Sequence, residues 1–238
     1  MKRKGISQEA LKLIACLTML VDHIAAAMAM DYDLYMRMGP QLYLVLRGIG
    51  RVAFPIYCFL MAEGAHHTRS PGRYALRLLV GAVLSEIPFD LALFGGISWA
   101  HQSVMVTLLL GFGALWAMKK CGHVLLKLLV ALPFILLGDL LMTDYGSYGV
   151  LLIVLLGFFR ELPLGKLMQC VSICLVCALI PSFNIRLGIF EISLELIGCL
   201  SVFPILLYFG HKQTQNKAVQ WAFYLFYPVH LLALALIL

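Results

Sequence analysis

The fold is decided first by residues 11–30, which read LKLIACLTMLVDHIAAAMAM. This run is long and apolar enough to cross a bilayer as one α-helix. It nevertheless carries an Asp-His pair, Asp22 and His23, at a depth where lipid is expected. Ionisable side chains are costly inside a membrane span and usually have a function there. Polar groups at the same depth in other spans are therefore the first candidates for a shared site.

The composition is that of an integral membrane protein. Of the 238 residues, 62% are hydrophobic and only 13% are charged, which is about half the charged share of a soluble domain. The net charge of +6 is explained by orientation in the membrane, so no nucleic-acid partner is expected. The apolar run behind the basic first residues is too long for a signal peptide, and we predict an uncleaved first span.

The seven cysteines do not predict a disulfide framework or a metal site. They lie mostly inside apolar runs, and Cys170, Cys174 and Cys177 have helical spacing. Zinc sites combine Cys and His in closed sets near water. We interpret the cysteines as small core residues and expect no metal.

Apolar stretches of about 20 residues are the unit of a helical membrane protein. The sequence predicts about nine such spans, so the expected fold class is all-α, a polytopic integral membrane bundle with a single domain over residues 1–238. Strands are not expected, because the apolar runs are continuous and lack two-residue alternation. The predicted spans cover residues 8–30, 42–64, 74–94, 103–118, 123–142, 145–159, 165–182, 190–209 and 218–238.

The basic residues of the loops predict the orientation of these spans. If the N-terminus lies in the cytoplasm, thirteen lysines and arginines fall in inner segments and only two, Arg37 and Arg186, in outer loops. Cytoplasmic loops carry such an excess of basic residues. We therefore predict a multi-pass protein of the cytoplasmic (inner) membrane, with its N-terminus inside and its C-terminus outside.

Helical rise places ionisable groups from distant spans in one slab of the membrane, toward its outer half. A single group would cost a few kcal/mol there, whereas gathered groups pair and line a wet cavity. Proline residues inside three of the spans, Pro55, Pro88 and Pro228, favour such a cavity. The groups in this slab are His23, Arg47, Arg51, Glu86, Asp90, Gln102, Thr107 and His230, with Asp139 and Asp144 at span ends.

A structural ion pair that locks two helices together is the alternative for each of these groups. For Arg47 and Glu86 both interpretations stay open. For His23 and His230 the sequence favours a function, because imidazole exchanges protons near neutral pH. Asp22 precedes His23 and points about 100° away on a helix, so it is not automatically the group that orients the imidazole.

Three basic residues predict an anionic ligand. Arg47 and Arg51 lie one turn apart on the same helix face, and a pair of arginines favours phosphate, pyrophosphate or carboxylate. Lys12 precedes His23 by eleven residues, which is about three turns on the same face. A donor with a phosphate-bearing handle would thus enter from the cytoplasm and present its reactive end to His23.

Four stretches, in the same order and spacing, together resemble the TraX family: KLIACLTMLVDHI (12–24), RGIGRVAFPIYCFL (47–60), DYGSYGVLLIVLLG (144–157) and FYLFYPVHL (223–231). The founding activity of that family is N-terminal acetylation of conjugative F-type pilin. The family is similar in turn to transmembrane acyltransferases that take acetyl-CoA from the cytoplasm and modify acceptors at the opposite face. The resemblance implies a membrane acetyltransferase with acetyl-CoA as donor substrate, no metal, and a pilin-like peptide or another envelope molecule as acceptor.

The resemblance also implies roles for the residues of the slab. His23 would be the general base for the acceptor amine or hydroxyl, or would transiently carry the acetyl group, and His230 would be its partner or the alternative base. Arg51 would position the donor or stabilise the developing oxyanion, and Asp22 would hold the local network. The related enzymes carry a basic residue and a histidine on their first helix, which Lys12 and His23 match. The other predicted members of the site are Arg47 for the donor and Glu86, Asp90, Gln102, Tyr145 and Tyr224 around the substrate.

Two other functions use the same kinds of residue. A proton-coupled secondary transporter also contains buried His, Asp and Arg, but transporters usually show internal repeats, and none is visible in this sequence. A non-catalytic assembly protein would not need two histidines and two arginines at one depth. We favour the acyltransferase, while the acceptor, the acyl chain length and the oligomeric state, including a homodimer, stay open.

Overall fold

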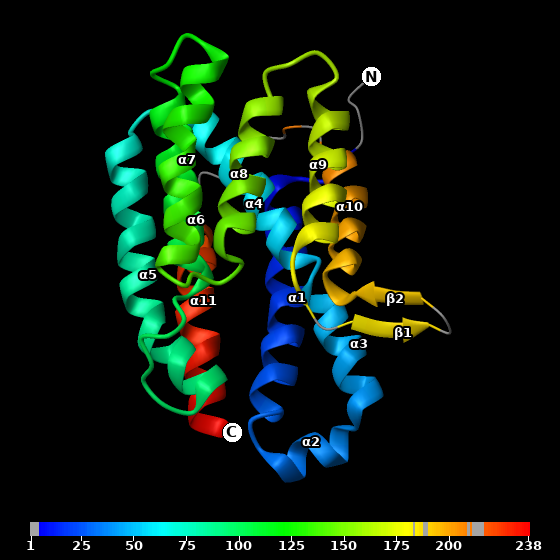
Figure 1. Cartoon of the computed structure of the whole chain (residues 1–238). Helices are drawn as coiled ribbons and strands as arrows, with labels where there is room; N and C mark the ends of the chain where they lie inside the picture. The colour runs from blue at the N-terminus through cyan, green and yellow to red at the C-terminus, as the bar shows by residue number, and fades with distance from the viewer. Residues whose placement is uncertain (1–4, 183, 188–189, 209, 211–216) are drawn as a thin grey trace. The chain divides into compact units, whose positions relative to one another are not determined.

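The computed structural model of the chain is built mainly from α-helices (Figure 1). It describes residues 5–182, 184–187, 190–208, 210 and 217–238. The elements are α1 (Gln8–Met28), α2 (Tyr32–Met38), α3 (Pro40–Gly50), α4 (Ala53–His67), α5 (Pro71–Phe94), α6 (Val104–Met118), α7 (Val124–Leu140), α8 (Gly146–Phe159), α9 (Gly165–Leu179), β1 (Asn184–Leu187), β2 (Phe190–Ser193), the 3₁₀-helix η1 (Leu194–Ser201), α10 (Val202–Leu206) and α11 (Lys217–Ile237). The all-helical class predicted from the sequence is confirmed.

Several of these helices have the length and composition of membrane spans. Gln8–Met28, Pro40–His67 and Ala218–Ile237 are long and apolar enough to cross a bilayer. Large apolar side chains also cover the exposed face of α7, namely Leu125, Leu128, Leu129, Leu132 and Leu136. Such a face is suited to lipid. The number of nine spans and their orientation stay predictions.

Local signals explain where the first helices begin. The side chain of Ser7 accepts a hydrogen bond from the backbone N–H of Ala10 at 3.1 Å, which caps α1. Asp31 caps α2 in the same way through the N–H of Leu34, at 2.9 Å. Gly39 then adopts a φ of +77°, a left-handed conformation that favours glycine. Pro40 follows as the first residue of α3, where a missing N–H costs nothing.

The predicted span 42–64 is divided into α3 and α4 at residues 51–52. Pro55 explains this division, because its ring lacks an N–H and would clash with the carbonyl of Arg51 in a continuous helix. In the structure Pro55 lies in the first turn of α4, where proline is tolerated.

The predicted span 190–209 is not one α-helix. It consists of β2, the 3₁₀-helix η1 and the short helix α10. β1 and β2 pair antiparallel, with Asn184 opposite Ser193, so the expectation of no strands is wrong for residues 184–187 and 190–193. Polar and apolar residues alternate along both strands, which is the strand pattern that a count of apolar residues does not reveal.

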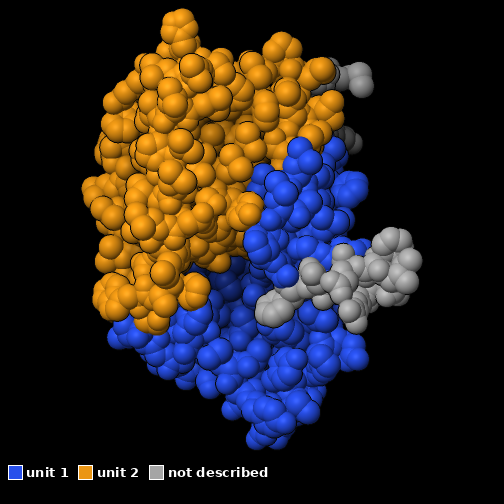
Figure 2. Space-filling view, in the orientation of Figure 1, with its two compact units in different colours: residues 1–57, 88–97, 173–238 blue, residues 58–87, 98–172 orange. Residues whose placement is uncertain are grey.

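The chain divides into two compact units, each described here by itself (Figure 2). The first unit comprises residues 1–57, 88–97 and 173–238, and the second comprises 58–87 and 98–172. In the first unit α1 packs against α3 and α11, and α3 packs against α2 and η1. All candidate catalytic residues predicted from the sequence belong to this first unit.

The second unit is organised around three helices, α6, α7 and α8, which pack against one another. Its apolar core includes Ala114, Met118, Ala131 and Val154. Gly111 faces Ile153 and Gly157 faces Leu115, so close that an added Cβ would lie within 2.4 Å of a side-chain carbon in both cases. Small residues thus allow α6 and α8 to approach closely, as is common between helices in membranes.

Candidate functional site

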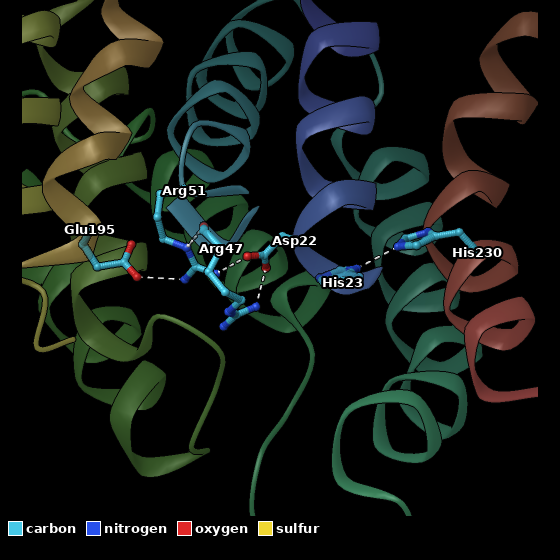
Figure 3. A network of polar contacts seen from close by, with 6 residues as sticks. All are labelled: Asp22, His23, Arg47, Arg51, Glu195 and His230. Carbon is cyan, nitrogen blue, oxygen red and sulfur yellow. Dashed lines mark hydrogen bonds and ion pairs between the residues drawn. The ribbon is translucent and has the colours of Figure 1, made fainter. Parts of the chain in front are cut away.

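Two histidines from opposite ends of the chain are in direct contact in the first unit (Figure 3). His23 lies on α1 and His230 on α11, and Nδ1 of His23 is 2.7 Å from Nε2 of His230. The two rings are almost parallel, at 5°. Only 8% of His23 and 7% of His230 is exposed. The structure thus brings these two predicted site residues together in a buried hydrogen bond.

The partners of His230 determine which nitrogens of the pair carry protons. Nδ1 of His230 lies 2.6 Å from the carbonyl oxygen of Phe226. A carbonyl only accepts hydrogen bonds, so Nδ1 of His230 is the protonated nitrogen. When His230 is neutral, its Nε2 must accept, and the proton in the contact belongs to Nδ1 of His23. The remaining nitrogen, Nε2 of His23, then carries a lone pair and can act as a base.

An aromatic side chain that the sequence analysis did not select completes the surroundings of the pair. Tyr227 is edge-on to both rings, at 5.9 Å from the centroid of His23 and 5.7 Å from that of His230. Tyr224, which was predicted for this place, instead makes an edge contact with Trp221 at 6.3 Å. Tyr227 is three residues before His230 and therefore lies on the same helix face, which is the signal that would have identified it.

Asp22 lies beside His23 in sequence but belongs to a different network (Figure 3). Its two carboxylate oxygens accept hydrogen bonds from Arg47 and from Arg51, both at 2.7 Å. In Figure 3 the Asp22 side chain leaves α1 toward the arginines, and the His23 side chain leaves it toward α11. Consecutive residues of one helix thus serve two polar contacts on different sides of it.

Gly50 allows α1 and α3 to come close enough for this network. A Cβ at Gly50 would lie 2.2 Å from the Cβ of Asp22, a distance that real side chains do not tolerate. α1 and α3 can therefore approach to the distance at which Arg47 and Arg51 both reach the carboxylate of Asp22.

Glu195 is a second carboxylate of the network that the sequence analysis missed. Its Oε1 accepts a hydrogen bond from Nη1 of Arg51 at 2.8 Å, and only 6% of Glu195 is exposed. The residue lies in η1, inside the stretch predicted as an ordinary span. A charged residue in that apolar stretch was the available signal.

The network is electrically balanced, with two arginines and two carboxylates. Arg51 also donates from Nε to the carbonyl oxygen of Arg47 at 3.1 Å. The side chains of Arg47 and Arg51 are 20% and 10% exposed, respectively. This geometry favours the structural alternative for Arg47, since both guanidinium groups already have carboxylate partners.

Lys12 and His23 face the same neighbour, α11. Nζ of Lys12 is 5.3 Å from the ring centroid of Phe223, while His23 contacts His230. Because both contacts follow the same order along the two helices, α1 and α11 run parallel, as two spans that both lead outward would.

The other predicted site residues are divided between the two units. Asp90 lies in the first unit, in the last part of α5, and is 2% exposed. Glu86, Gln102 and Tyr145 belong to the second unit. The carboxylate of Glu86 accepts the backbone N–H of Ser103 at 3.2 and 3.3 Å, which places a negative charge at the N-terminus of α6.

Gln102 and Tyr145 lie near a backbone connection within the second unit. The N–H of Gln102 donates to the carbonyl of Met142 at 3.0 Å, and the N–H of Asp144 donates to the carbonyl of Gln102 at 2.8 Å. Tyr145 follows directly and has a φ of +65° before the first turn of α8. Glu86, Gln102 and Tyr145 therefore lie around the N-terminal ends of α6 and α8.

Comparison with known proteins identifies relatives over nearly the whole chain. The sequence model of the family described as TraX protein matches residues 7–238. The chain is 28% identical over 237 residues to a protein of Dichelobacter nodosus named probable fimbrial assembly protein FimC, serogroup H1. The aligned region covers 93% of this chain and 91% of that protein. No solved structure matches the chain.

Proposed function

The chain belongs to the TraX family, and from this premise we propose that it is a membrane-embedded acetyltransferase. It transfers an acetyl group from cytoplasmic acetyl-CoA to an acceptor in the envelope, with His23 as the catalytic base. The observation that carries this proposal is the buried contact of 2.7 Å between His23 and His230. In a buried pair of imidazoles, one ring can accept a proton directly, without a bridging water.

The tautomers derived above give each histidine a distinct part. Nε2 of His23 takes the proton from the acceptor amine while the amine nitrogen attacks the carbonyl carbon of the thioester. His230 is a positioning residue, since its Nε2 holds the Nδ1–H of His23 and its own Nδ1–H is held by the Phe226 carbonyl. This chain of contacts orients the His23 ring and stabilises the imidazolium that forms.

The proton on His23 then completes the reaction. When the tetrahedral intermediate collapses, the carbon–sulfur bond breaks and the thiolate leaves. The proton from Nε2 of His23 passes to that thiolate, so that coenzyme A departs as the thiol and the acceptor departs as the acetamide. His23 returns to its starting tautomer, and neither oxidant nor metal is needed for the balance.

The balanced network of Asp22, Arg47, Arg51 and Glu195 supports this centre indirectly. It holds α1 to α3 and η1 through three ion pairs of 2.7–2.8 Å, and α1 carries His23. In this proposal Asp22 and the two arginines position the catalytic helix, and Lys12 lies on the same face of α1 as His23, toward the donor's side of entry.

The amine of a pilin-like peptide is the proposed acceptor. The similarity to a protein named for fimbrial assembly supports this choice, because fimbriae are built from pilin subunits whose free amine groups an acetyltransferase can modify. The attack on a thioester requires such an amine in its unprotonated form, and His23 then takes the proton that the amine nitrogen loses as it attacks.

The test is acetyl transfer by the purified full-length protein in lipid nanodiscs. The protein receives acetyl-CoA labelled in the acetyl group, together with a peptide that has the N-terminus of a pilin from the same cell. We expect label on the peptide amine, and a loss of about 10² or more in rate for His23→Ala. His101→Ala, which removes an exposed histidine outside the first unit, serves as the matched control. Full activity of His23→Ala would refute the assignment of the base.

The proton-coupled transporter is the alternative that the same histidine pair favours, because paired imidazoles also relay protons. Proteoliposomes with an imposed pH gradient separate the two functions. Under the proposed function, protons do not cross faster than in empty liposomes. Proton-driven uptake of a solute, together with an absence of acetyl transfer, would replace the enzyme by the transporter.

A further inference from the structure

Two adjoining hollows lie in the second unit, which contains none of the candidate catalytic residues. The first has a volume of about 260 Å³ and lies where α4 ends, α5 begins and α6 ends. The second has a volume of about 190 Å³ and lies between the ends of α4, α6 and α8 and the start of α7. Ala65 and Lys119 line both of them, so the two hollows meet around the side chain of Lys119.

The lining of the hollows carries an excess of positive charge. Arg160 also lines the second hollow, but it is paired with Glu63, with Nε and Oε1 2.5 Å apart. Nδ1 of His66 lies 3.5 Å from the carboxylate of Glu161. Within the described part of the chain, the remaining cations of the lining form no ion pair. They are Arg69, Lys119, Lys120 and Lys127.

The position of Lys127 and the start of α7 point to an anion rather than to helix stabilisation. Lys127 lies in the first turns of α7, where the helix dipole disfavours a positive charge. His123, the residue before α7, makes no side-chain capping hydrogen bond. The N-cap residue thus leaves the first N–H groups of α7 without a side-chain cap, and Val124, the first residue of α7, lines the second hollow. Backbone N–H groups and a lysine are what a phosphate needs at a helix N-terminus.

An aromatic surface accompanies the cations in the first hollow. Trp116 lines it and is 45% exposed, and Nζ of Lys120 lies 4.0 Å from the centroid of one of its rings. Phe112 lies at the base of the same hollow, stacked on Tyr74 at 4.7 Å. An exposed indole is a stacking platform for a planar base. Inorganic phosphate has no ring that could stack on it.

We propose that these two hollows form a binding site for a nucleoside diphosphate or its esters. The phosphates lie against Lys119, Lys127 and the N-terminus of α7, and the base lies on Trp116. The predicted topology places these segments on the cytoplasmic side, where nucleotides are available. That the natural ligand is the nucleotide part of coenzyme A rests on the proposed function, whereas nucleotide binding itself does not.

Equilibrium binding of radiolabelled ADP to the full chain, in nanodiscs of neutral phosphatidylcholine, tests the site. We expect saturable binding that Lys119→Gln weakens about tenfold or more, because a charge-assisted contact to phosphate is lost. Arg37→Gln removes one exposed charge from α2 in the first unit and is the matched control. Equal affinity in Lys119→Gln and in the wild type would overturn the site.

Trp116→Leu separates a nucleotide from the other source of phosphate, an anionic lipid headgroup. We expect this variant to weaken ADP binding about tenfold while the binding of inorganic pyrophosphate stays unchanged. Absence of ADP binding, combined with retention of phosphatidylglycerol that depends on Lys119, would show a lipid site and refute the nucleotide.

Acetyl transfer is measured on the same variants. ADP carries no acyl group, so ADP binding without transfer would refute the proposed function and keep the nucleotide site. Transfer at the wild-type rate and donor KM in Lys119→Gln would keep the proposed function and refute that this site holds the nucleotide part of coenzyme A.

Discussion

The two units differ in how some of their basic side chains are paired. In the first unit the side chains of Arg47 and Arg51 are partly buried, and each has a carboxylate partner at 2.7 Å in Asp22. In the second unit Lys119 and Lys120 are exposed and form no ion pair with any residue that the structure describes. Paired cations hold helices together, whereas cations around a hollow are available to a ligand. This difference therefore distinguishes cations that stabilise the fold from cations that we propose bind a ligand.

Asp22→Asn removes the carboxylate that pairs with the arginines of the first unit, and we expect it to have the largest effect. The substitution leaves Arg47 without its carboxylate and Arg51 with only Glu195. Removing one partner of a buried ion pair costs about 3–5 kcal/mol, so we expect a clearly lower unfolding temperature in nanodiscs, together with loss of activity. Asp33→Asn, in exposed α2, is the control. A stable Asp22→Asn protein would mean that the network does not hold α1.

His230→Ala tests whether the histidine pair acts as the tautomers indicate. It removes the acceptor for the Nδ1–H of His23, and we expect a loss of about 10² in the rate of acetyl transfer. His230→Asn offers a carbonyl oxygen as acceptor and should recover part of this loss. The pH–rate profile should shift in both variants. Equal activity of the Ala and Asn variants would argue against a positioning role of the imidazole.

Gly50→Ala tests the close approach of α1 and α3. The new methyl group would collide with Asp22, and such overpacking costs about 1–3 kcal/mol. Thermal unfolding measures the effect. Gly72→Ala is the matched control, because an added Cβ at Gly72 meets no atom within 4 Å. If both variants unfold at the wild-type temperature, the contact between Gly50 and Asp22 is looser than described.

Lys119→Gln has the smallest expected effect on stability. It tests whether an unpaired cation of the second unit is needed for the fold. An exposed cation without an ion-pair partner contributes within about 0.5 kcal/mol, so the unfolding temperature should stay unchanged while ADP binding falls. Arg160→Gln is the opposite case, because it would leave the buried carboxylate of Glu63 with only His67, whose Nε2 lies 3.6 Å away. Destabilisation by Lys119→Gln would show that this lysine is structural.

The sequence was most informative where an ionisable residue lies inside an apolar stretch. His23, Arg47, Arg51 and His230 were identifiable because ionisable groups are rare in apolar spans. The turn of about 100° between Asp22 and His23 indicated that Asp22 does not automatically orient the imidazole, and in the structure Asp22 bonds Arg47 while His23 contacts His230.

Partners that depend on tertiary structure were beyond the sequence. The charge of Glu195 is visible in the sequence, but its pairing with Arg51 depends on a strand and a 3₁₀-helix in a segment that is predicted as one regular span. Tyr224 was the predicted tyrosine of the site, whereas Tyr227, which shares the helix face of His230, contacts the histidine pair. The pairing of Glu63 with Arg160 joins α4 to the end of α8, and no local pattern announces such a contact.

The neighbouring positions of Asp22 and His23 have a mechanical consequence. Both side chains are rigidly attached to the same turn of α1, so a twist of that helix moves them together about one axis. The two ion pairs of Asp22 resist such a twist, and they thereby set the angle at which the His23 ring meets His230. The carboxylate of Asp22 thus restrains the rotation of α1 without taking part in the chemistry. Substitutions around it should slow proton transfer at His23 before they unfold the protein.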